Sequence, residues 1–296
     1  MEAVEKHFLV TVSDDYKHLT GVEFICSFFK KLSEHQITLL HICRLDAADM
    51  NKALMEMWET PEDKVTGSLT IGARKALQKA SQLLGESNMS IDQMITKTCA
   101  ERFGKIRDIL NEGSAGLYDA LILGKRASYA LQWMVERLAD ETAQALLKES
   151  ALKTPLWICP APEAGRKNVL VCVDGSAESL RAVDHTGYIL SRQDQHKITL
   201  LHVENGAGLD DQAIFQQSKQ ILANHTIADE RINQESTWGI NIAGTIRNYA
   251  DKGGFAVIAV GLHGVEQGIL KRINLAGGTT SSLIHTAEKI TIWCCP

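Results

Sequence analysis

Short apolar runs alternate along the chain with longer segments in which apolar residues recur at helical spacing. In the second half the apolar runs predict five strands: Asn168 to Val173, Ile198 to Val203, about Asn233 to Gly239, Phe255 to Gly261 and Ile290 to Cys295. The helical spacing predicts four helices between them: Ser179 to Leu190, Asp211 to Ala223, Gly244 to Ala250 and about Thr280 to Ala287. Such alternation is typical of an α/β fold, in which helices cover both faces of a parallel sheet.

The pattern occurs twice. Phe8 to Val12 corresponds to Val169 to Val173, and Ile37 to Ile42 corresponds to Ile198 to Val203 at the same spacing. Three further pairs are Gly104-Lys105-Ile106-Arg107 with Gly244-Thr245-Ile246-Arg247, Ala120 to Gly124 with Val257 to Gly261, and Cys159-Pro160 with Cys295-Pro296. A repeat of this length indicates a duplicated domain and not a solenoid. We expect two tandem five-stranded parallel-sheet domains, residues 1–160 and 161–296, with a Pro/Gly-rich linker at the junction.

Composition narrows the class of protein. An apolar fraction of 45% and a formal net charge of -5 are typical of a soluble globular protein and argue against nucleic acid as a partner. The chain shows neither a membrane-spanning stretch nor a signal-peptide pattern at its start, so we expect no membrane partner and a cytoplasmic location. The seven cysteines lack metal-ligand spacing and are interpreted as reduced core residues.

Polar and glycine-rich segments follow the predicted strands where a ligand would bind. In such a sheet the crevice lies at the carboxyl ends of the strands, where the strand order reverses. Asp174 follows the first strand of the second half, Gly261-Leu262-His263-Gly264 follows the fourth, and Gly277-Gly278-Thr279-Thr280 precedes the last helix. Glycines and a helix N-terminus bring backbone N–H groups to a phosphate, and a carboxylate accepts from a ribose hydroxyl or an adenine amine. Each motif also has a structural interpretation, as a capped turn or a flexible loop, but their joint placement favours a nucleotide site.

At these residues the chain resembles the universal stress proteins. The resemblance covers nearly the whole chain and is most specific in the second half, at Val169 to Ser176, Ser179 to Ala182, Leu200 to Val203 and the Gly-x2-Gly element. It implies a Rossmann-like parallel α/β domain, similar to the adenine nucleotide alpha hydrolases, that binds ATP or AMP, with Mg²⁺ possible beside ATP. In that family pattern Asp174 and the Val203 backbone hold adenine and ribose. The phosphates are held by Gly261, Gly264, Gly277 and Gly278 with the hydroxyls of Thr279 and Thr280. His263 lies beside the predicted phosphate site and can pair with phosphate when protonated.

Two features depart from the family pattern. The spacer between Gly264 and Gly277 has twelve residues and is longer than the family's, although Gly278-Thr279 restores the expected dipeptide if one more residue is counted. The first half has Ser13 in place of Asp174, Ala127 in place of Gly264, and Asp140-Glu141 near the place of Gly277-Gly278. A carboxylate pair repels phosphate, so we expect the first half to be a structural partner with a degenerate site.

The first half also carries extra residues between its second and fourth strands. They place Met50, Met55, Met57 and Trp58 ahead of a helix predicted over Ile71 to Leu84. Such a cluster serves either core packing and domain contact or the binding of a partner protein.

The functional hypothesis follows from these observations. No catalytic constellation and no metal-ligand spacing is evident, so neither a catalytic residue nor a metal site is predicted, and His41 and His202 are interpreted as structural. We expect an intramolecular pseudo-dimer, paired through Leu156 to Cys159 and Ile290 to Cys295, whose apolar edges otherwise invite aggregation. The second half binds ATP or AMP in a stress-response or regulatory role, and a homodimer or an unidentified protein partner remains open. A nucleotide-free scaffold and a slow ATP-hydrolysing enzyme are the alternatives.

Overall fold

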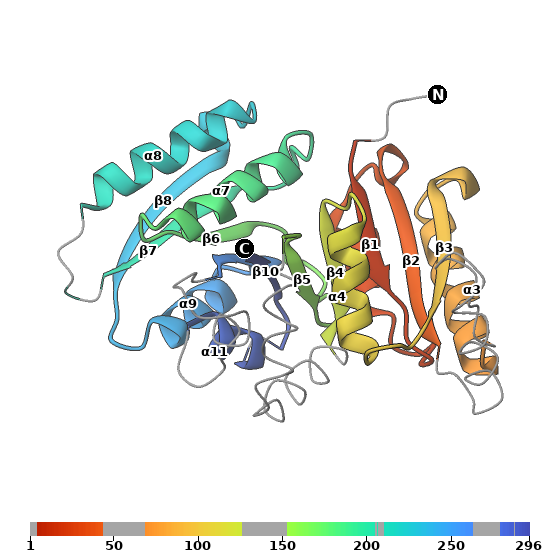
Figure 1. The fold of residues 1–296 in the computed structure, drawn as a ribbon. Coiled ribbons are helices and arrows are strands. Elements are labelled where there is room, and N and C mark those ends of the chain that lie inside the picture. Colours follow the sequence, from red (N-terminus) through yellow and green to blue (C-terminus); the bar gives the residue numbers. More distant parts are fainter. Residues whose placement is uncertain are drawn as a thin grey trace.

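Ten strands of the described part of the chain form one continuous sheet. The computed structural model describes residues 5–43, 69–125, 153–204, 206, 210–262, 279–286 and 288–296. The strand order is β3-β2-β1-β4-β5-β10-β9-β6-β7-β8 (Figure 1). The strands are β1 (His7–Thr11), β2 (Gln36–Cys43), β3 (Met94–Ala100), β4 (Ala120–Gly124), β5 (Leu156–Cys159), β6 (Val169–Cys172), β7 (Ile198–Glu204), β8 (Ile232–Trp238), β9 (Val257–Gly261) and β10 (Thr291–Cys295). All pairs within each half are parallel, which confirms the predicted α/β class.

Helices cover both faces of this sheet. They are α1 (Thr20–Phe28), α3 (Ile71–Glu86), α4 (Lys105–Ala115), α7 (Ala177–Leu190), α8 (Asp211–Asn224), α9 (Ile242–Lys252) and α11 (Thr279–Thr286), with 3₁₀ turns at Leu32–Glu34, Ile91–Gln93 and Asp229–Arg231. Side chains of α1, α3, α7 and α8 join one apolar core, and those of α4, α9 and α11 join the other. The predicted helix over Ile71 to Leu84 is confirmed as α3. Both cores extend through the two halves of the chain, so the halves share their packing.

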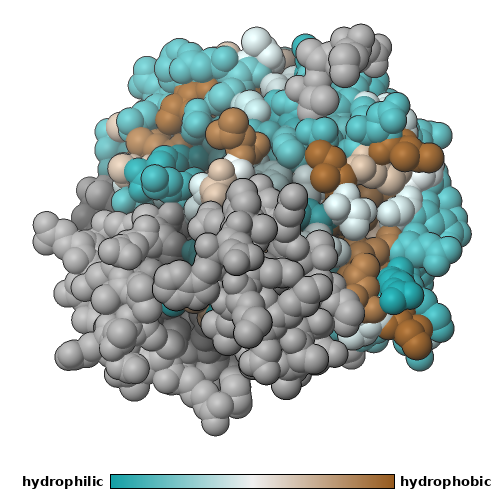
Figure 2. All heavy atoms as spheres, turned by 45° about the vertical axis from the view of Figure 1, so that its right-hand side comes forward, coloured by the Kyte–Doolittle hydropathy of each residue, from teal (hydrophilic) through white to brown (hydrophobic). Residues whose placement is uncertain are grey.

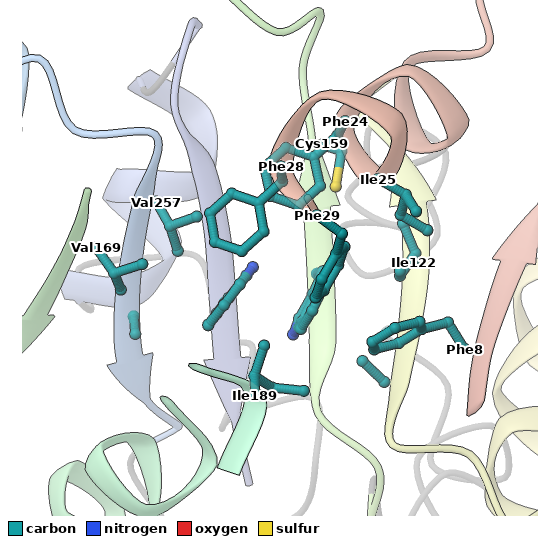
Figure 3. Packing of buried hydrophobic residues seen from close by; sticks show 14 of the residues in the cluster. Phe8, Phe24, Ile25, Phe28, Phe29, Ile122, Cys159, Val169, Ile189 and Val257 are labelled. Atoms are coloured by element: carbon teal, nitrogen blue, oxygen red, sulfur yellow. The ribbon is translucent and has the colours of Figure 1, made fainter. Parts of the chain in front are cut away.

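The two halves meet at an antiparallel strand pair in the centre of the sheet. β5 pairs with β10, with Trp157 directly opposite Trp293, as the sequence predicts for the two last strands. The two indole rings stack with centroids 4.3 Å apart, and both are fully buried. Phe24 and Phe28 of α1 point into the same core from the first half (Figure 3). The pairing therefore covers the apolar strands that otherwise form exposed edges.

Polar strands form the outer edges. β8 has the sequence INQESTW, and its central residues are exposed, while β3 carries Lys97. Polar and charged residues on an edge strand disfavour pairing with another chain. On the face seen in Figure 2, apolar patches lie between hydrophilic residues.

One part of the predicted repeat is wrong. Gly104 precedes α4 and Asn241 precedes α9, so Gly104 corresponds to Asn241 and not to Gly244. Ile246 accordingly corresponds to Ile109, and both side chains are buried. Apolar positions in a helix recur every three or four residues, so an alignment shifted by three residues keeps the apolar stripe in phase and passes unnoticed in the sequence.

Several sequence expectations lie outside the described residues. They concern Met50, Met55, Met57, Trp58, Ala127 and the Asp140-Glu141 pair. Within the described residues, no helix is long and apolar enough to cross a membrane.

Candidate functional site

A cavity of about 250 Å³ opens at the carboxyl edge of the second-half strands. Strand order reverses between β6 and β9, and residues at the carboxyl ends of both strands line the cavity, as expected for a ligand crevice at a switch point. Its volume lies near the lower end of small-molecule sites, about 300 Å³. The lining residues are Cys172, Val173, Asp174, Ser176, Ser179, His202, Val203, Ile242, Ile246, Val260, Gly261, Thr279 and Thr280.

The loop after β6 holds Asp174 at this cavity. Asp174 Oδ1 accepts hydrogen bonds from the Ser176 backbone N–H at 3.0 Å and from the Ser176 hydroxyl at 2.6 Å. The Ser176 hydroxyl oxygen in turn accepts from the Ser179 N–H at 3.2 Å and caps α7. Gly175 between them has φ +77°, a conformation that favours glycine. The segment is therefore a capped turn, and the same turn fixes a carboxylate at the cavity.

The end of β9 approaches α7 so closely that only glycine fits. A Cβ atom on Gly261 would lie 2.4 Å from the carbonyl carbon of Glu178 and 2.5 Å from its oxygen. The Thr280 hydroxyl donates to the Gly261 carbonyl at 3.2 Å, which fixes the first turn of α11 beside the strand end. The backbone N–H groups of a first helical turn have no partner within the helix, and Thr279 and Thr280 of this turn line the cavity.

His202 is held by the backbone at the bottom of the site. Its Nδ1 lies 2.7 Å from the Val173 carbonyl oxygen, and its Nε2 lies 3.5 Å from Asp211 Oδ1 at the start of α8. His41 makes the equivalent contact with Val12 at 2.7 Å. Both histidines thus tie β-strand ends together, which supports the structural interpretation.

Apolar side chains complete the walls. Ile242 and Ile246 of α9 face the cavity opposite the Asp174 loop, and Cys172 lies on β6 below it. Burial raises the pKa of the Cys172 thiol well above its ordinary value, and Asp174 adds to that effect, so the thiol stays protonated at neutral pH. The cavity therefore combines an apolar slot with a carboxylate on one side and helix N–H donors on the other.

Five of the predicted site residues come together here: Asp174, Val203, Gly261, Thr279 and Thr280 line the same cavity. The other four, His263, Gly264, Gly277 and Gly278, lie outside the described residues. The sequence reasoning missed Ser179, Ile242 and Ile246, although the correct helix register points the two isoleucines toward the strand ends. No group of three or more potential metal ligands is found in the described part of the chain.

The first half has a cavity of about 280 Å³ at the corresponding strand ends, with different chemistry. Lys105 and Lys125 line it where the second half has Ile242 and Leu262, and Ser13 stands in place of Asp174. Asp14 Oδ2 lies 3.5 Å from Lys105 Nζ. Partial burial acts to raise the pKa of Asp14, but the Thr70 hydroxyl and Lys105 outweigh it, and the pKa lies below its ordinary value. Lys105, which forms this pair, lines the cavity at the position where the second half has the apolar Ile242.

The fold and this site define a class of protein: an α/β protein built from two similar halves, with a small-molecule type of cavity at a topological switch point. Residues 165–292 match the model of the Universal stress protein family. No curated protein sequence matches the chain.

Solved structures extend the likeness to the full length. A universal stress protein from Archaeoglobus fulgidus DSM 4304 is 15% identical, covers 98% of this chain and 96% of its own, and has a TM-score of 0.62. A Pseudomonas aeruginosa protein assigned to the same family is 15% identical, covers 99% and 94%, and has a TM-score of 0.50. A universal stress protein in complex with cAMP is 22% identical over 44% of this chain and 95% of its own, with a TM-score of 0.37. The second half therefore matches the universal stress protein family in sequence, and the chain is similar in fold to solved universal stress proteins along its full length.

Proposed function

We propose that the second half binds an adenine nucleotide, ATP or AMP, in the cavity at β6, β7, β9 and α11, and that occupancy regulates a stress response. The observation that carries this proposal is the convergence of Asp174, Val203, Gly261 and Thr280 from four separate segments on one cavity. Chance placement of the separate motifs in a loop, a strand end and a helix start would leave them dispersed.

Each wall suits one part of the nucleotide. The slot between Val203, Ile242 and Ile246 takes the adenine ring, because it is apolar and narrow. Asp174 accepts from a ribose hydroxyl or from the adenine amine. The first turn of α11 at Thr279 and Thr280 supplies N–H groups and a favourable dipole for phosphate oxygens. His263, Gly264, Gly277 and Gly278 belong to the phosphate part of the proposal, and Mg²⁺ would enter with ATP.

The first half serves as the structural partner in this proposal. Residues 1–160 and 161–296 form the two domains, each with five strands, and the β5–β10 pair replaces the contact between two chains. Lys105 and Lys125 stand in the first-half cavity where the second half has Ile242 and Leu262, and these two lysines disfavour an adenine ring there.

The experiment combines identification of bound ligand with a titration. Purified protein is denatured and the released small molecules are identified by mass spectrometry, and ATP, AMP and cAMP are then titrated calorimetrically. Asp174→Ala tests the site, and Ser13→Ala is the matched control, because Ser13 occupies the equivalent position in the first half.

We expect one adenine nucleotide per chain, with binding weakened about tenfold or more by Asp174→Ala, since a charge-assisted hydrogen bond contributes about 1.5–3 kcal/mol. Ser13→Ala should bind as the unmodified protein does. Binding that Asp174→Ala leaves intact would place the nucleotide elsewhere. Absence of binding would favour the scaffold alternative.

A further inference from the structure

A third cavity lies at the opposite edge of the sheet, where the two halves meet. It has a volume of about 610 Å³, and it is bounded by the end of α1, the linker, and the loops before β7 and β10. Phe24 and Phe28 form an aromatic wall, and the buried His196 ring stacks on Phe28 with centroids 4.1 Å apart. Figure 3 shows both phenylalanines at the junction. The proposed nucleotide site shares no lining residue with this cavity.

The duplication gives this cavity a counterpart across the junction, and there the space is filled. Phe8 pairs with Ile37 and Ala120 in the first half, and Val169 pairs with Ile198 and Val257 in the second. Phe8 is therefore equivalent to Val169, and Ala120 is equivalent to Val257. By the same register Lys6 corresponds to Lys167, and Asp119 to Ala256. On the helices, Ser27 of α1 and Tyr188 of α7 have the same separation along the chain as Phe8 and Val169.

Tyr188 fills the counterpart space. Lys6 Nζ lies 3.6 Å from the centroid of the Tyr188 ring, a cation–π geometry. The Tyr188 hydroxyl donates to Asp119 Oδ1 at 2.8 Å, and Asp119 Oδ2 accepts from the His7 backbone N–H at 2.6 Å. An aromatic ring, a carboxylate and a lysine thus form one closed group between the halves.

The open side keeps the lysine but lacks both the ring and the carboxylate. Ser27 replaces the tyrosine, Ala256 replaces the aspartate, and all three of Ser27, Ala256 and Lys167 line the cavity. The backbone N–H of Asn168 corresponds to that of His7. Because Ala256 has no carboxylate, the residue in place of Asp119 offers this N–H no side-chain acceptor. The open side is therefore complementary to the group that closes the other side.

The charge of the cavity favours an anion. Four cations line it: Lys30, Arg166, Lys167 and Lys289. Glu163, the one carboxylate among the described residues that line it, accepts from Arg166 at 2.7 Å and from Lys289 at 2.9 Å. Lys30 and Lys167 have no ion pair among the described residues, so two positive charges are left for a ligand.

We infer that this junction cavity binds a small aromatic carboxylate, with the ring under Lys167 against Phe24 and Phe28 and the carboxylate at the position equivalent to Asp119. The bound ligand makes in this cavity the contacts that the chain's own Tyr188 and Asp119 make in the counterpart space. Its carboxylate accepts from the Asn168 N–H and pairs with Lys167.

The test uses 2-naphthoate as the probe. Its binding to the full chain is measured by saturation-transfer and ¹⁵N-edited NMR. A ligand of this size binds with a dissociation constant on the order of 1 mM. Decahydro-2-naphthoate keeps the charge and loses the aromatic face, and we expect it to bind about two- to fivefold more weakly. Amide shifts should concentrate at Phe28, Lys167 and His196.

Two variants locate the site. Ser27→Tyr combined with Ala256→Asp rebuilds the closed group and should reduce binding at least tenfold. Lys167→Gln is exposed and should fold normally, and it should weaken binding about fivefold or more, whereas Lys79→Gln on α3 removes an exposed lysine elsewhere and should change nothing.

The inference is overturned if 2-naphthoate shows no binding at ten times the expected dissociation constant. It is also overturned if Lys167→Gln and Lys79→Gln bind alike, or if the amide shifts concentrate at another surface. Because Lys167→Gln does not require repacking, the result does not depend on whether the double variant folds.

Discussion

Acidification should destabilise this protein through two histidines buried at the junction. His185 of α7 and His35 before β2 are 8% and 1% exposed. Burial lowers the pKa of His185 to about 3 and that of His35 to about 4, and the positive charge of Lys6 acts in the same direction. The neutral His185 ring accepts a hydrogen bond from Trp157 Nε1 at 3.0 Å, which a protonated ring cannot accept.

The size of the effect follows from proton linkage. Both histidines have an ordinary pKa of about 6.5 in the unfolded chain. Below that pH the unfolded state binds protons that the folded state does not, so stability falls as the pH falls from 6.5 toward the folded values. At pH 5, about 1.5 pH units below the unfolded pKa, proton binding stabilises the unfolded state relative to the folded state. This amounts to about 2 kcal/mol per histidine at about 1.4 kcal/mol per pH unit. The pair therefore contributes about 4 kcal/mol of lost stability between pH 7.5 and pH 5.

Urea denaturation at pH 7.5 and pH 5 measures this loss, and His185→Phe separates the two contributions. Phenylalanine is chosen because Phe24 of α1 packs edge-on against Trp157 as His185 packs against Trp293. The variant should lose about 2 kcal/mol less than the unmodified protein between the two pH values. Trp157→Phe removes the indole donor but keeps the buried histidine, so it should retain the original pH dependence. Equal losses in the unmodified protein and in His185→Phe would refute the reasoning.

Two further predictions concern packing. Trp157→Ala removes a fully buried ring that stacks on Trp293. The free energy of unfolding, measured by urea denaturation at pH 7.5, should fall by about 3–5 kcal/mol. A loss below about 1 kcal/mol would show that the stack is not a main contact between the halves. Gly261→Ala places a methyl group against the Glu178 backbone, and it should cost about 1–3 kcal/mol in the same assay and also weaken AMP binding. Gly85→Ala is the control, since it lies in α3 with nothing within 4 Å of the added methyl group and should be stabilising by about 0.5–1 kcal/mol.

Much of the fold was predictable because its causes are local. Apolar runs such as Ile198 to Val203 and helical stripes such as that of α7 depend only on residues near in sequence. The predicted strands of the second half match β6 to β10 within two residues at each end. The predicted alignment of Gly104 with Gly244 was wrong because a helical stripe fixes which face of a helix is buried but not the position of the helix along its axis.

The candidate site was predictable in part. Asp174 and Gly261 stand out because each follows a strand directly, and parallel strands bring their carboxyl ends to one edge. Ile242 and Ile246 carry no comparable signal, because an isoleucine in a helix is ordinary until the partner across the cavity is known. His202 could be interpreted as structural from its repeat in His41, but only the structure shows the Val173 carbonyl that holds it.

The sequence by itself determined the duplication, the α/β class and the edge of the sheet on which the second-half motifs lie, because each of these depends on spacing along the chain. Only the tertiary structure decided which residues of one half meet the other. The contact of Tyr188 with Lys6 and Asp119, and the space left where Ser27 and Ala256 stand instead, join positions that are far apart in sequence. Such pairings arise from the antiparallel register of β5 and β10, which no local pattern encodes.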